Sequence, residues 1–478
     1  MKINDYTSDQ IDAAVSAAEN IANDWAQSSR ETRARLLRGL ADVLQARRDK
    51  LVCVGDDETS LGSVRLNSEL DRTIFQLRGF AEHVEDGNAF AVSDDPAIAG
   101  APPLGRPHLT RVRVPLGPVA MFSASNFPIA FSVLGGDTAS ALAAGCPVVV
   151  KAHPGHPQLS REVFELTKAV LTQQGLPEGL IGMVEGAGIE VGVGLVRHPG
   201  IAAVAFTGSF KGGTALWSHA NSRPRPIPFY GELGSTNPVV ALPSALTGNA
   251  EELARTLAAS MEFGCGQICT SPGLVVLFES ADADRFESAL RDALQSAKTH
   301  TMLTPSMKHN FDAGIARLVA TPGVQTVLAG ESTNDDHASP RPVIARTSAQ
   351  NFISEHALHE EVFGPACLLV RVQSIDEIVE VLNAVGGSLT VTLWGAEVDS
   401  PDVRRITRCA TQIAGRVLFG GVPTGVAVTA SQQHGGPWPA STQPFSTSVG
   451  YAAMDRFLRP VALQNPPAWL IERVGQPC

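Results

Sequence analysis

The residues best suited to chemistry in this chain are a cysteine and a glutamate that lie among small or apolar neighbours. Cys269 lies in the segment 264–270, whose glycines would let a ligand approach the thiol. Glu232 lies in the segment 231–234. A thiol can attack an electrophilic carbon, and a carboxylate that reaches the same pocket can serve as a base. Asn126 adds an amide donor, so a nucleophile, a base and a donor are all present.

Each of these residues also has an ordinary structural explanation. A free cysteine is often a small buried core residue, and we assign Cys146 and Cys265 to packing on that basis. Glu232 could be a surface carboxylate, although its apolar neighbours argue against that. Asn126 precedes Phe-Pro, where asparagine commonly forms a turn. The combination, and no single residue, indicates a catalytic site.

Two further features could bind a cofactor. The segment 206–213 follows an expected strand and opens a helix, where glycines let a phosphate approach backbone N–H groups. It is not GxGxxG, and an ordinary strand-to-helix turn would look the same. Lys151 ends an earlier strand and could bind a ribose or its phosphate, although a lone strand-end lysine is usually solvated.

Alternating short strands and helices are expected to position these residues. The segment 8–53 reads as two surface helices, and the segment 59–86 reads as another helical stretch. Short apolar strands then alternate with helices, which predicts a parallel doubly wound sheet. Those strands are expected at 119–122, 147–150, 181–184 and 202–206. The alternation restarts after Pro238 with a helix at 249–263, the Cys269 loop and a strand at 273–278. The sequence therefore predicts an α/β protein with a ligand crevice between two such units.

Length, charge and cysteine usage limit the classes of function. A chain of 478 residues is expected to form about three domains. The net charge of -11 argues against nucleic acid or an anionic membrane as a partner. Seven scattered cysteines without metal-ligand spacing predict free thiols in a cytoplasmic setting and no metal site. We expect no signal peptide, and the most apolar region, 134–150, is a poor membrane span.

Six segments together resemble the aldehyde dehydrogenase superfamily. They extend over nearly the whole chain, from about residue 10 to 465, in the family's order and at plausible spacing. The six are Asn-Phe-Pro at 126–128, Val-Val-Lys at 149–151, Phe-Thr-Gly-Ser at 206–209, Glu-Leu-Gly at 232–234, Gly-Gln-x-Cys at 266–269 and Glu-Glu-Val-Phe-Gly-Pro at 360–365. Chance agreement of all six is negligible.

The resemblance implies a role for each of these segments. Cys269 would attack the aldehyde, Asn126 would help to form the oxyanion hole, and Glu232 would activate the water that hydrolyses the thioester. Cofactor contacts would come from Ser125, Lys151, Gly208, Ser209, Gly212, Glu361 and Phe363. An apolar substrate tunnel would be lined by Phe127, Phe131, Ile268 and Phe445.

The resemblance also implies an architecture. A Rossmann-type cofactor domain would comprise residues 1–108 and 115–240, and an α/β catalytic domain would comprise 241–430. A small β-ribbon for oligomerisation would be formed by 109–114 and the tail 445–478, because a lone ribbon is marginal in isolation. The assembly would be a homodimer or a homotetramer.

The cofactor implied by the resemblance is NAD or NADP, and one position favours NADP. NAD-preferring members often carry a glutamate three residues after the strand-end lysine, where this chain has Pro154. No carboxylate is then left to repel a 2′-phosphate, and Lys151 would attract one. NADP is therefore the expected cofactor, with NAD as a possible second.

One branch of the superfamily is especially similar. The segments 131–139, 151–157 and 434–440 look like those of 2-oxoglutarate-semialdehyde dehydrogenases. NADP-dependent long-chain fatty aldehyde dehydrogenases share much of the same sequence. A keto-acid semialdehyde would need a cationic partner, which Arg72 or Arg78 could supply, although each could equally be a surface arginine. A medium- or long-chain fatty aldehyde therefore remains the alternative substrate.

Two other classes share this fold. Acylating reductases, which release the thioester to another acceptor, lack the Glu-Leu-Gly base that is present here at Glu232. A non-catalytic binding or structural member would have lost the nucleophile or the base, yet Cys269, Glu232 and Asn126 are all present. Both alternatives are therefore disfavoured.

Overall fold

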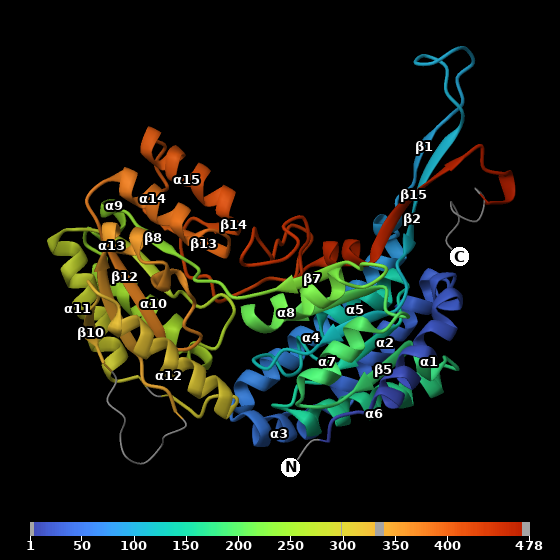
Figure 1. Cartoon of the computed structure of the whole chain (residues 1–478), viewed down its shortest axis with the longest axis horizontal. Helices are drawn as coiled ribbons and strands as arrows, with labels where there is room; N and C mark the ends of the chain where they lie inside the picture. The colour runs from blue at the N-terminus through green and yellow to red at the C-terminus, as the bar shows by residue number, and fades with distance from the viewer. Residues whose placement is uncertain (1–3, 298, 330–338, 471–478) are drawn as a thin grey trace.

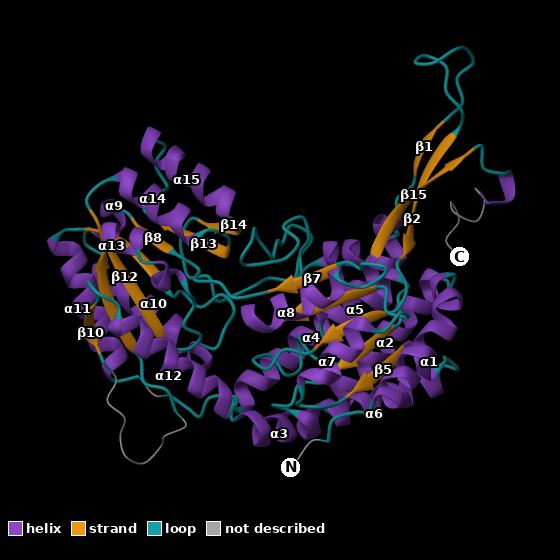
Figure 2. Cartoon of the chain, viewed as in Figure 1, coloured by secondary structure: helices purple, strands orange, loops and turns teal. Residues whose placement is uncertain are grey.

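The strands form three separate sheets, and each sheet builds a different part of the molecule (Figure 1). The computed structural model describes residues 4–297, 299–329 and 339–470. Figure 2 shows one lobe around each of the two larger sheets, with the third sheet projecting as a ribbon. The predicted α/β fold is confirmed.

The first lobe contains a five-stranded parallel sheet in the order β5-β4-β3-β6-β7. Its strands are β3 (Val119–Phe122), β4 (Val148–Lys151), β5 (Ile181–Val184), β6 (Ala203–Thr207) and β7 (Phe229–Glu232). They are short apolar runs, as expected for strands covered by helices on both faces. The chain leaves β3 first toward β4 and later toward β6. The carboxyl ends of β3 and β6 therefore border the crevice where doubly wound sheets bind ligands.

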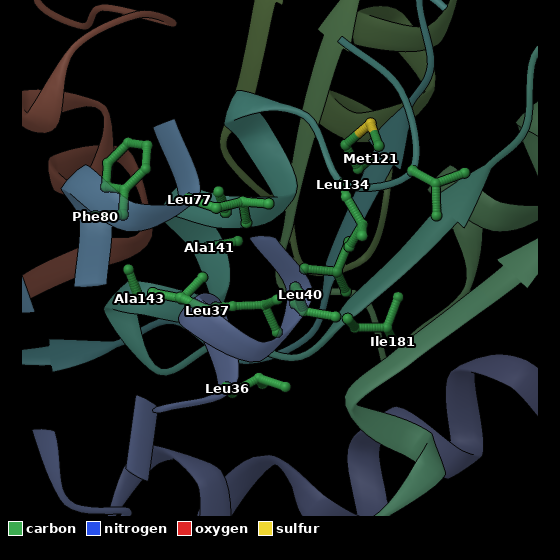
Figure 3. Close-up of a cluster of buried hydrophobic side chains, with 14 of the residues drawn as sticks. Leu36, Leu37, Leu40, Leu77, Phe80, Met121, Leu134, Ala141, Ala143 and Ile181 are labelled. Carbon is green, nitrogen blue, oxygen red and sulfur yellow. The ribbon is translucent and has the colours of Figure 1, made fainter. Parts of the chain in front are cut away.

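Helices cover both faces of this sheet. They are α1 (Ser8–Ala26), α2 (Arg30–Ala46), α3 (Arg48–Thr59), α4 (Ser63–Asp86), α5 (Gly136–Ala144), α6 (Pro157–Gln173), α7 (Ile189–Arg197) and α8 (Phe210–Asn221). Figure 3 shows leucines of α2 and α4 packed with alanines of α5 beside Met121 and Ile181 of the sheet. This cluster fixes α4 against the sheet, which matters because α4 reaches the active site.

The expectation of two surface helices over 8–53 is wrong in two respects. The segment contains α1, α2 and the start of α3, and Leu36, Leu37 and Leu40 of α2 are completely buried. The break before α2 depends on a cap, in which Ser29 accepts a hydrogen bond from the backbone N–H of Thr32 at 3.0 Å. Leucine periodicity continues across such a break, so it does not reveal where one helix ends.

The second lobe contains a seven-stranded sheet in the order β10-β11-β12-β9-β8-β13-β14, with only the edge strand β10 antiparallel. Its strands are β8 (Val239–Ala241), β9 (Leu274–Phe278), β10 (Gln325–Leu328), β11 (Val343–Ser348), β12 (Ala366–Val372), β13 (Ser388–Trp394) and β14 (Ala414–Leu418). Its helices are α9 (Pro243–Leu246), α10 (Ala250–Glu262), α11 (Ala281–Gln295), α12 (Pro305–Ala320), α13 (Ala349–Ser354), α14 (Ile375–Val385) and α15 (Pro401–Ile413).

The third sheet is an antiparallel ribbon in the order β1-β2-β15 that extends away from both lobes (Figure 1). Its strands are β1 (Ser93–Asp95), β2 (Leu109–Pro115) and β15 (Leu458–Gln464). The strand β1 lies within the segment 1–108 that was expected in the cofactor domain. The 3₁₀ helix Tyr451–Phe457, expected in the ribbon, packs instead into the core of the first lobe. Residues 471–478 of the expected tail lie outside the described residues.

Among the described residues, no helix is both long and apolar enough to cross a membrane.

Candidate active site

Cys269 follows a tight left-handed turn at the end of α10. Gly264, Cys265 and Gly266 have φ values of 59°, 54° and 65°, so the backbone adopts a region that favours glycine in three consecutive residues. A Cβ atom on Gly266 would lie 2.4 Å from the backbone of Gly364. The glycine therefore allows the cysteine loop to lie directly against the segment 360–365.

Buried amide side chains fix the loop after this turn. The Nδ2 of Asn237 donates to the carbonyl oxygen of Cys269 at 2.9 Å and to that of Ser271 at 3.0 Å. The Oε1 of Gln267 accepts the backbone N–H of Leu303 at 3.1 Å. These bonds satisfy loop backbone groups that burial would otherwise leave unpaired, and they hold Cys269 in one position.

His434 lies between Cys269 and Glu232. Its Nε2 is 3.6 Å from the Sγ of Cys269 and 3.1 Å from the Oε1 of Glu232. The Oγ of Ser448 donates to the Oε2 of Glu232 at 2.7 Å. The side chains of Glu232 and His434 are only 4% and 1% exposed. The cysteine, the imidazole and the carboxylate thus form a continuous buried chain of contacts.

Sequence reasoning identified Cys269 and Glu232 but gave no role to His434 or Ser448. His434 was noticed only as part of a segment shared with one branch, and Ser448 carried no signal. The strand β7, which ends at Glu232, was not predicted either. A glycine- and proline-rich segment has no periodicity, so nothing in its sequence shows that it returns to the cysteine.

The surroundings shift the pKa values of Cys269 and Glu232 in opposite directions. Burial and the charge of Glu232 raise the pKa of the Cys269 thiol well above its usual range. Burial opposes ionisation of Glu232, but the charge of His434 and hydrogen bonds from His434, Ser448 and Cys269 lower its pKa overall. The resting site therefore holds its proton on sulfur and its negative charge on Glu232. The thiol must lose that proton when it attacks.

The ligand atoms of Glu232, Cys269 and His434 all lie within 4.8 Å of one another, a spacing that a metal ion could bridge. The hydrogen bonds among the three side chains account for this spacing without a metal ion.

Asn126 lies beside the cysteine loop. Its Nδ2 donates to the carbonyl oxygen of Gln267 at 3.0 Å, and its own carbonyl oxygen accepts from Nη2 of Arg65, also at 3.0 Å. An amide nitrogen carries two N–H bonds, so the second remains able to reach a ligand oxygen. A Cys269 adduct and this amide can therefore meet at one oxygen.

The four residues expected to line the substrate tunnel have different surroundings. Phe127 and Phe131 are half-buried with their ring centroids 5.3 Å apart, and Ile268 is fully buried next to Cys269. Phe445 is 96% exposed, so in this single chain it forms no part of an enclosed wall and its expected place is wrong. An apolar residue in an irregular segment gives no indication of where it faces.

The two arginines considered as partners of a substrate carboxylate also differ in their exposure to solvent. Arg78 is 50% exposed and forms a surface ion pair with Asp42 at 3.0 Å. Arg72 faces inward from α4, and its guanidinium carbon is 5.9 Å from the ring centroid of Phe131. The charge of Arg72 also acts to lower the pKa of Cys269, against the larger effect of burial.

Comparisons with known proteins identify the family of the chain. The model of the aldehyde dehydrogenase family matches residues 1–457. The chain belongs to this family. It is 45% identical to alpha-ketoglutaric semialdehyde dehydrogenase 2 of Azospirillum brasilense, covering 91% of this chain and 83% of the relative. It is 38% identical to alpha-ketoglutaric semialdehyde dehydrogenase of Acinetobacter baylyi, covering 98% and 89%.

A solved structure supports the fold of this aldehyde dehydrogenase. Proline utilization A of Bradyrhizobium japonicum superimposes with a TM-score of 0.81 at 26% identity. The match covers 96% of this chain and 45% of that larger protein. Aldehyde dehydrogenases oxidise aldehydes with NAD(P), so this chain is an oxidoreductase that requires a nicotinamide cofactor.

The residues expected to bind the phosphate and ribose groups of such a cofactor are suitable for it. Ser209 caps α8, and its Oγ accepts the backbone N–H of Gly212 at 3.2 Å, so the helix N-terminus follows directly after Gly208. The Nζ of Lys151 donates to the carbonyl oxygens of Gly186 at 2.5 Å and Ala152 at 3.1 Å. An ammonium has three N–H bonds, so one remains for a ligand.

Two further expected cofactor residues lie between the cysteine loop and β12. Glu361 and Phe363 are half-buried, and a Cβ atom on Gly234 would lie 2.6 Å from the Oε2 of Glu361. Gly234 thus leaves room for this carboxylate. Burial and nearby Glu232 raise the pKa of Glu361 to about 8, despite a backbone hydrogen bond from Ser235. Ser125 lies beside Met307, with its Oγ 4.0 Å from the sulfur. These groups fit a nicotinamide and its ribose.

Proposed function

We propose that this aldehyde dehydrogenase oxidises 2-oxoglutarate semialdehyde to 2-oxoglutarate, with NADP as its preferred cofactor. The reaction consumes the aldehyde, water and oxidised cofactor and yields the carboxylate, reduced cofactor and protons. The observation that carries the chemistry is the buried cluster in which Glu232 contacts both the Cys269 thiol and the His434 imidazole. The substrate rests on two relatives that carry the name of this activity.

The first step is attack of Cys269 on the aldehyde carbon. The carbon–sulfur bond forms while the thiol proton passes to Glu232, which accepts a hydrogen bond from Cys269. The Nε2–H of His434 donates to the Oε1 of Glu232 at 3.1 Å and holds that carboxylate in position. Glu232 releases the proton to solvent before the thioester is hydrolysed. The new oxyanion binds the Asn126 amide and the backbone N–H of Cys269, and each donor contributes about 3 kcal/mol to lowering the barrier.

The second step converts the adduct to the acid. A nicotinamide cofactor held by Lys151, Ser209 and Glu361 would supply hydride acceptance, and the carbon bonded to Cys269 would then be at the oxidation level of a thioester. Glu232, kept ionised by its neighbours, then takes a proton from a water molecule that attacks the thioester carbon. The carbon–sulfur bond breaks, the acid leaves, and Cys269 regains its proton.

Replacing His434 with glutamine should slow formation of the acyl-enzyme by about 100-fold at neutral pH, because Glu232, which accepts the thiol proton, loses the charge and the hydrogen bond that keep it ionised. The deficit should shrink as pH rises and the thiol ionises without help. Rapid-mixing measurement of the first turnover of reduced cofactor reports this step. His198→Gln, which alters a histidine paired with Asp12 near the surface, is the control. An unchanged first-turnover rate would contradict the role of His434.

The preference for NADP is proposed from Lys151 and from Pro154. Burial lowers the pKa of Lys151 to about 8, although Asp5 and Glu185 oppose that shift. The ammonium is charged below this pH and neutral above it, so attraction for a 2′-phosphate should fade as pH rises. The ratio of kcat/KM for NADP to that for NAD should therefore fall between pH 7 and pH 9.

Lys151→Met should remove both the preference and its pH dependence. The matched control is Lys50→Met, because the ammonium of Lys50 pairs with Glu162 on the surface at 2.6 Å. A ratio that is constant with pH in the wild type would contradict this role for Lys151.

The substrate is tested by comparing kcat/KM for 2-oxoglutarate semialdehyde with that for a medium-chain fatty aldehyde such as octanal. A clear preference for the keto acid is expected. A preference for octanal would keep the mechanism and replace the substrate by the fatty aldehyde alternative. An intact cluster of cysteine, imidazole and carboxylate argues against a non-catalytic member, and Glu232 argues against an acylating reductase.

We also propose that the enzyme is a cytoplasmic homodimer or homotetramer. The thiols of Cys53, Cys146, Cys265, Cys269, Cys367 and Cys409 are free, as expected in a reducing compartment. The projecting ribbon β1-β2-β15 is too small a sheet to be stable alone, so docking on a second copy would support it. Light scattering after size-exclusion chromatography distinguishes these assemblies from a monomer.

A further inference from the structure

Two arginines on α4 face the active site. Arg65 and Arg72 are seven residues apart, which is close to two helical turns, so they lie on the same face of the helix. The Nη2 of Arg65 donates to the carbonyl oxygen of Asn126, and its guanidinium carbon is 4.6 Å from the ring centroid of Phe127 and 4.9 Å from that of Phe263. Arg65 therefore has a structural role beside the oxyanion site.

Arg72 is only partly used by its surroundings. Its Nη1 donates to the carbonyl oxygen of Val426. Its Nε and Nη2 are buried and have no hydrogen-bond partner among the described residues. An arginine stays charged in a protein, and buried donors of a charged group are costly when they remain unpaired. The Nε–Nη2 edge is thus a site prepared for an acceptor.

The adjacent carboxylate of Glu69 does not take this place. Its Oε1 accepts the backbone N–H groups of Ile129 at 2.7 Å and Ala130 at 2.9 Å. Its Oε2 lies 3.8 Å from the Nε of Arg65. Glu69 therefore serves the turn after Asn126 and the neighbouring arginine, and it forms no hydrogen bond with Arg72 in the part of the chain that the structure describes.

A second guanidinium contacts the same chain segment. Arg416 of β14 donates to the carbonyl oxygens of Pro423 at 2.5 Å and Gly425 at 2.6 Å, while Arg72 binds the next carbonyl at Val426. Both guanidinium groups are close enough to Cys269 to favour a negative charge there, and the nearby buried carboxylate of Glu69 acts on Arg72 as well. Two arginines therefore hold the segment 423–426 beside the cysteine, in a protein whose net charge is -11.

We infer that the free Nε–Nη2 edge of Arg72 binds the carboxylate of an aldehyde acid whose other end reaches Cys269, which makes Arg72 the residue that selects a semialdehyde over an uncharged aldehyde. This inference rests on the proposed function. A planar fork of two parallel N–H bonds matches a carboxylate and would satisfy both unpaired nitrogens at once. The same charge would disfavour a fatty aldehyde, whose alkyl chain would leave the donors unpaired.

The test compares three aldehydes of five carbons: 2-oxoglutarate semialdehyde, 5-oxopentanoate, which lacks the 2-oxo group, and pentanal, which lacks the carboxylate as well. The wild type should prefer both acids to pentanal. Arg72→Met should lower kcat/KM for the acids by about 100-fold, mainly through a higher KM, and leave pentanal unchanged. Arg78→Met, on the same helix but at the surface, should leave all three unchanged.

A second variant and an activity-independent readout guard against misfolding. Arg72→Lys keeps the charge without the fork, so its preference for the acids should lie between those of the wild type and Arg72→Met. Bound 2-oxoglutarate should protect Cys269 from alkylation by iodoacetamide in the wild type and much less in Arg72→Met.

The outcomes separate the two proposals. If the wild type prefers uncharged aldehydes, the proposed substrate is wrong. If the wild type prefers the acids and Arg72→Met keeps that preference, the assignment of Arg72 alone is overturned. Equal loss toward acids and pentanal would also overturn it, because Arg72 would then only hold the segment around Val426.

Discussion

Replacing Cys269 with alanine is expected to abolish turnover, by about 10⁴-fold or more, while leaving cofactor affinity unchanged. The thiol forms the bond through which the aldehyde is oxidised, and a methyl group offers no electrons for that bond. None of the expected phosphate and ribose contacts at Lys151 or the N-terminus of α8 involves this sulfur. Production of reduced cofactor measures turnover, and titration calorimetry measures NADP binding.

The control for this variant is Cys53→Ala, because Cys53 is an exposed thiol outside the site. It should keep full activity and remove only surface alkylation. A Cys269→Ala enzyme that still oxidised aldehydes at a measurable fraction of the wild-type rate would contradict a covalent mechanism. In that case Asn126, which donates to the carbonyl oxygen of Gln267, would contribute only by binding the aldehyde.

The sequence predicted those parts of the site that depend on local pattern. Short apolar strands between helices identified the parallel sheet around β3 and placed Lys151 at a strand end. The glycines at 264 and 266 indicated an open loop before Cys269, and they form the left-handed turn that presents it. Such features depend on backbone preferences of neighbouring residues, which a single sequence contains.

The parts that sequence missed depend on contacts between distant segments. His434 lies 165 residues after Cys269, and Ser448 lies 216 residues after Glu232. His434 and Ser448 reach the site because the chain leaves β14 and returns to the first lobe through an irregular segment. The same is true of Arg72, whose neighbours within α4 do not distinguish it from Arg78. Only the packed structure shows that Arg72 keeps buried donors unpaired while Arg78 pairs with Asp42 at the surface.

Replacing Glu232 with glutamine should slow hydrolysis of the thioester by about 10²- to 10⁴-fold and change the kinetics from steady turnover to a burst. Glutamine keeps the shape of the side chain but cannot accept a proton from water. The first turnover should still release about one equivalent of reduced cofactor per active site, because the nucleophile is intact and the lower pKa of the thiol offsets the loss of Glu232 as its base. Rapid mixing separates this burst from the slow steady state. Glu85→Gln, at a surface pair with Arg38, is the control.

The same substitution should act in the opposite direction on the resting thiol. The charge of Glu232 raises the pKa of Cys269, so removing that charge should lower this pKa and increase the thiolate fraction at a given pH. Alkylation by iodoacetamide should therefore become faster while turnover becomes slower. A variant that was merely misfolded would not give faster alkylation together with a full first burst. An unchanged steady-state rate would contradict the role of Glu232 as the base. Slower alkylation would contradict the proposed resting state, in which Cys269 is protonated and Glu232 is ionised.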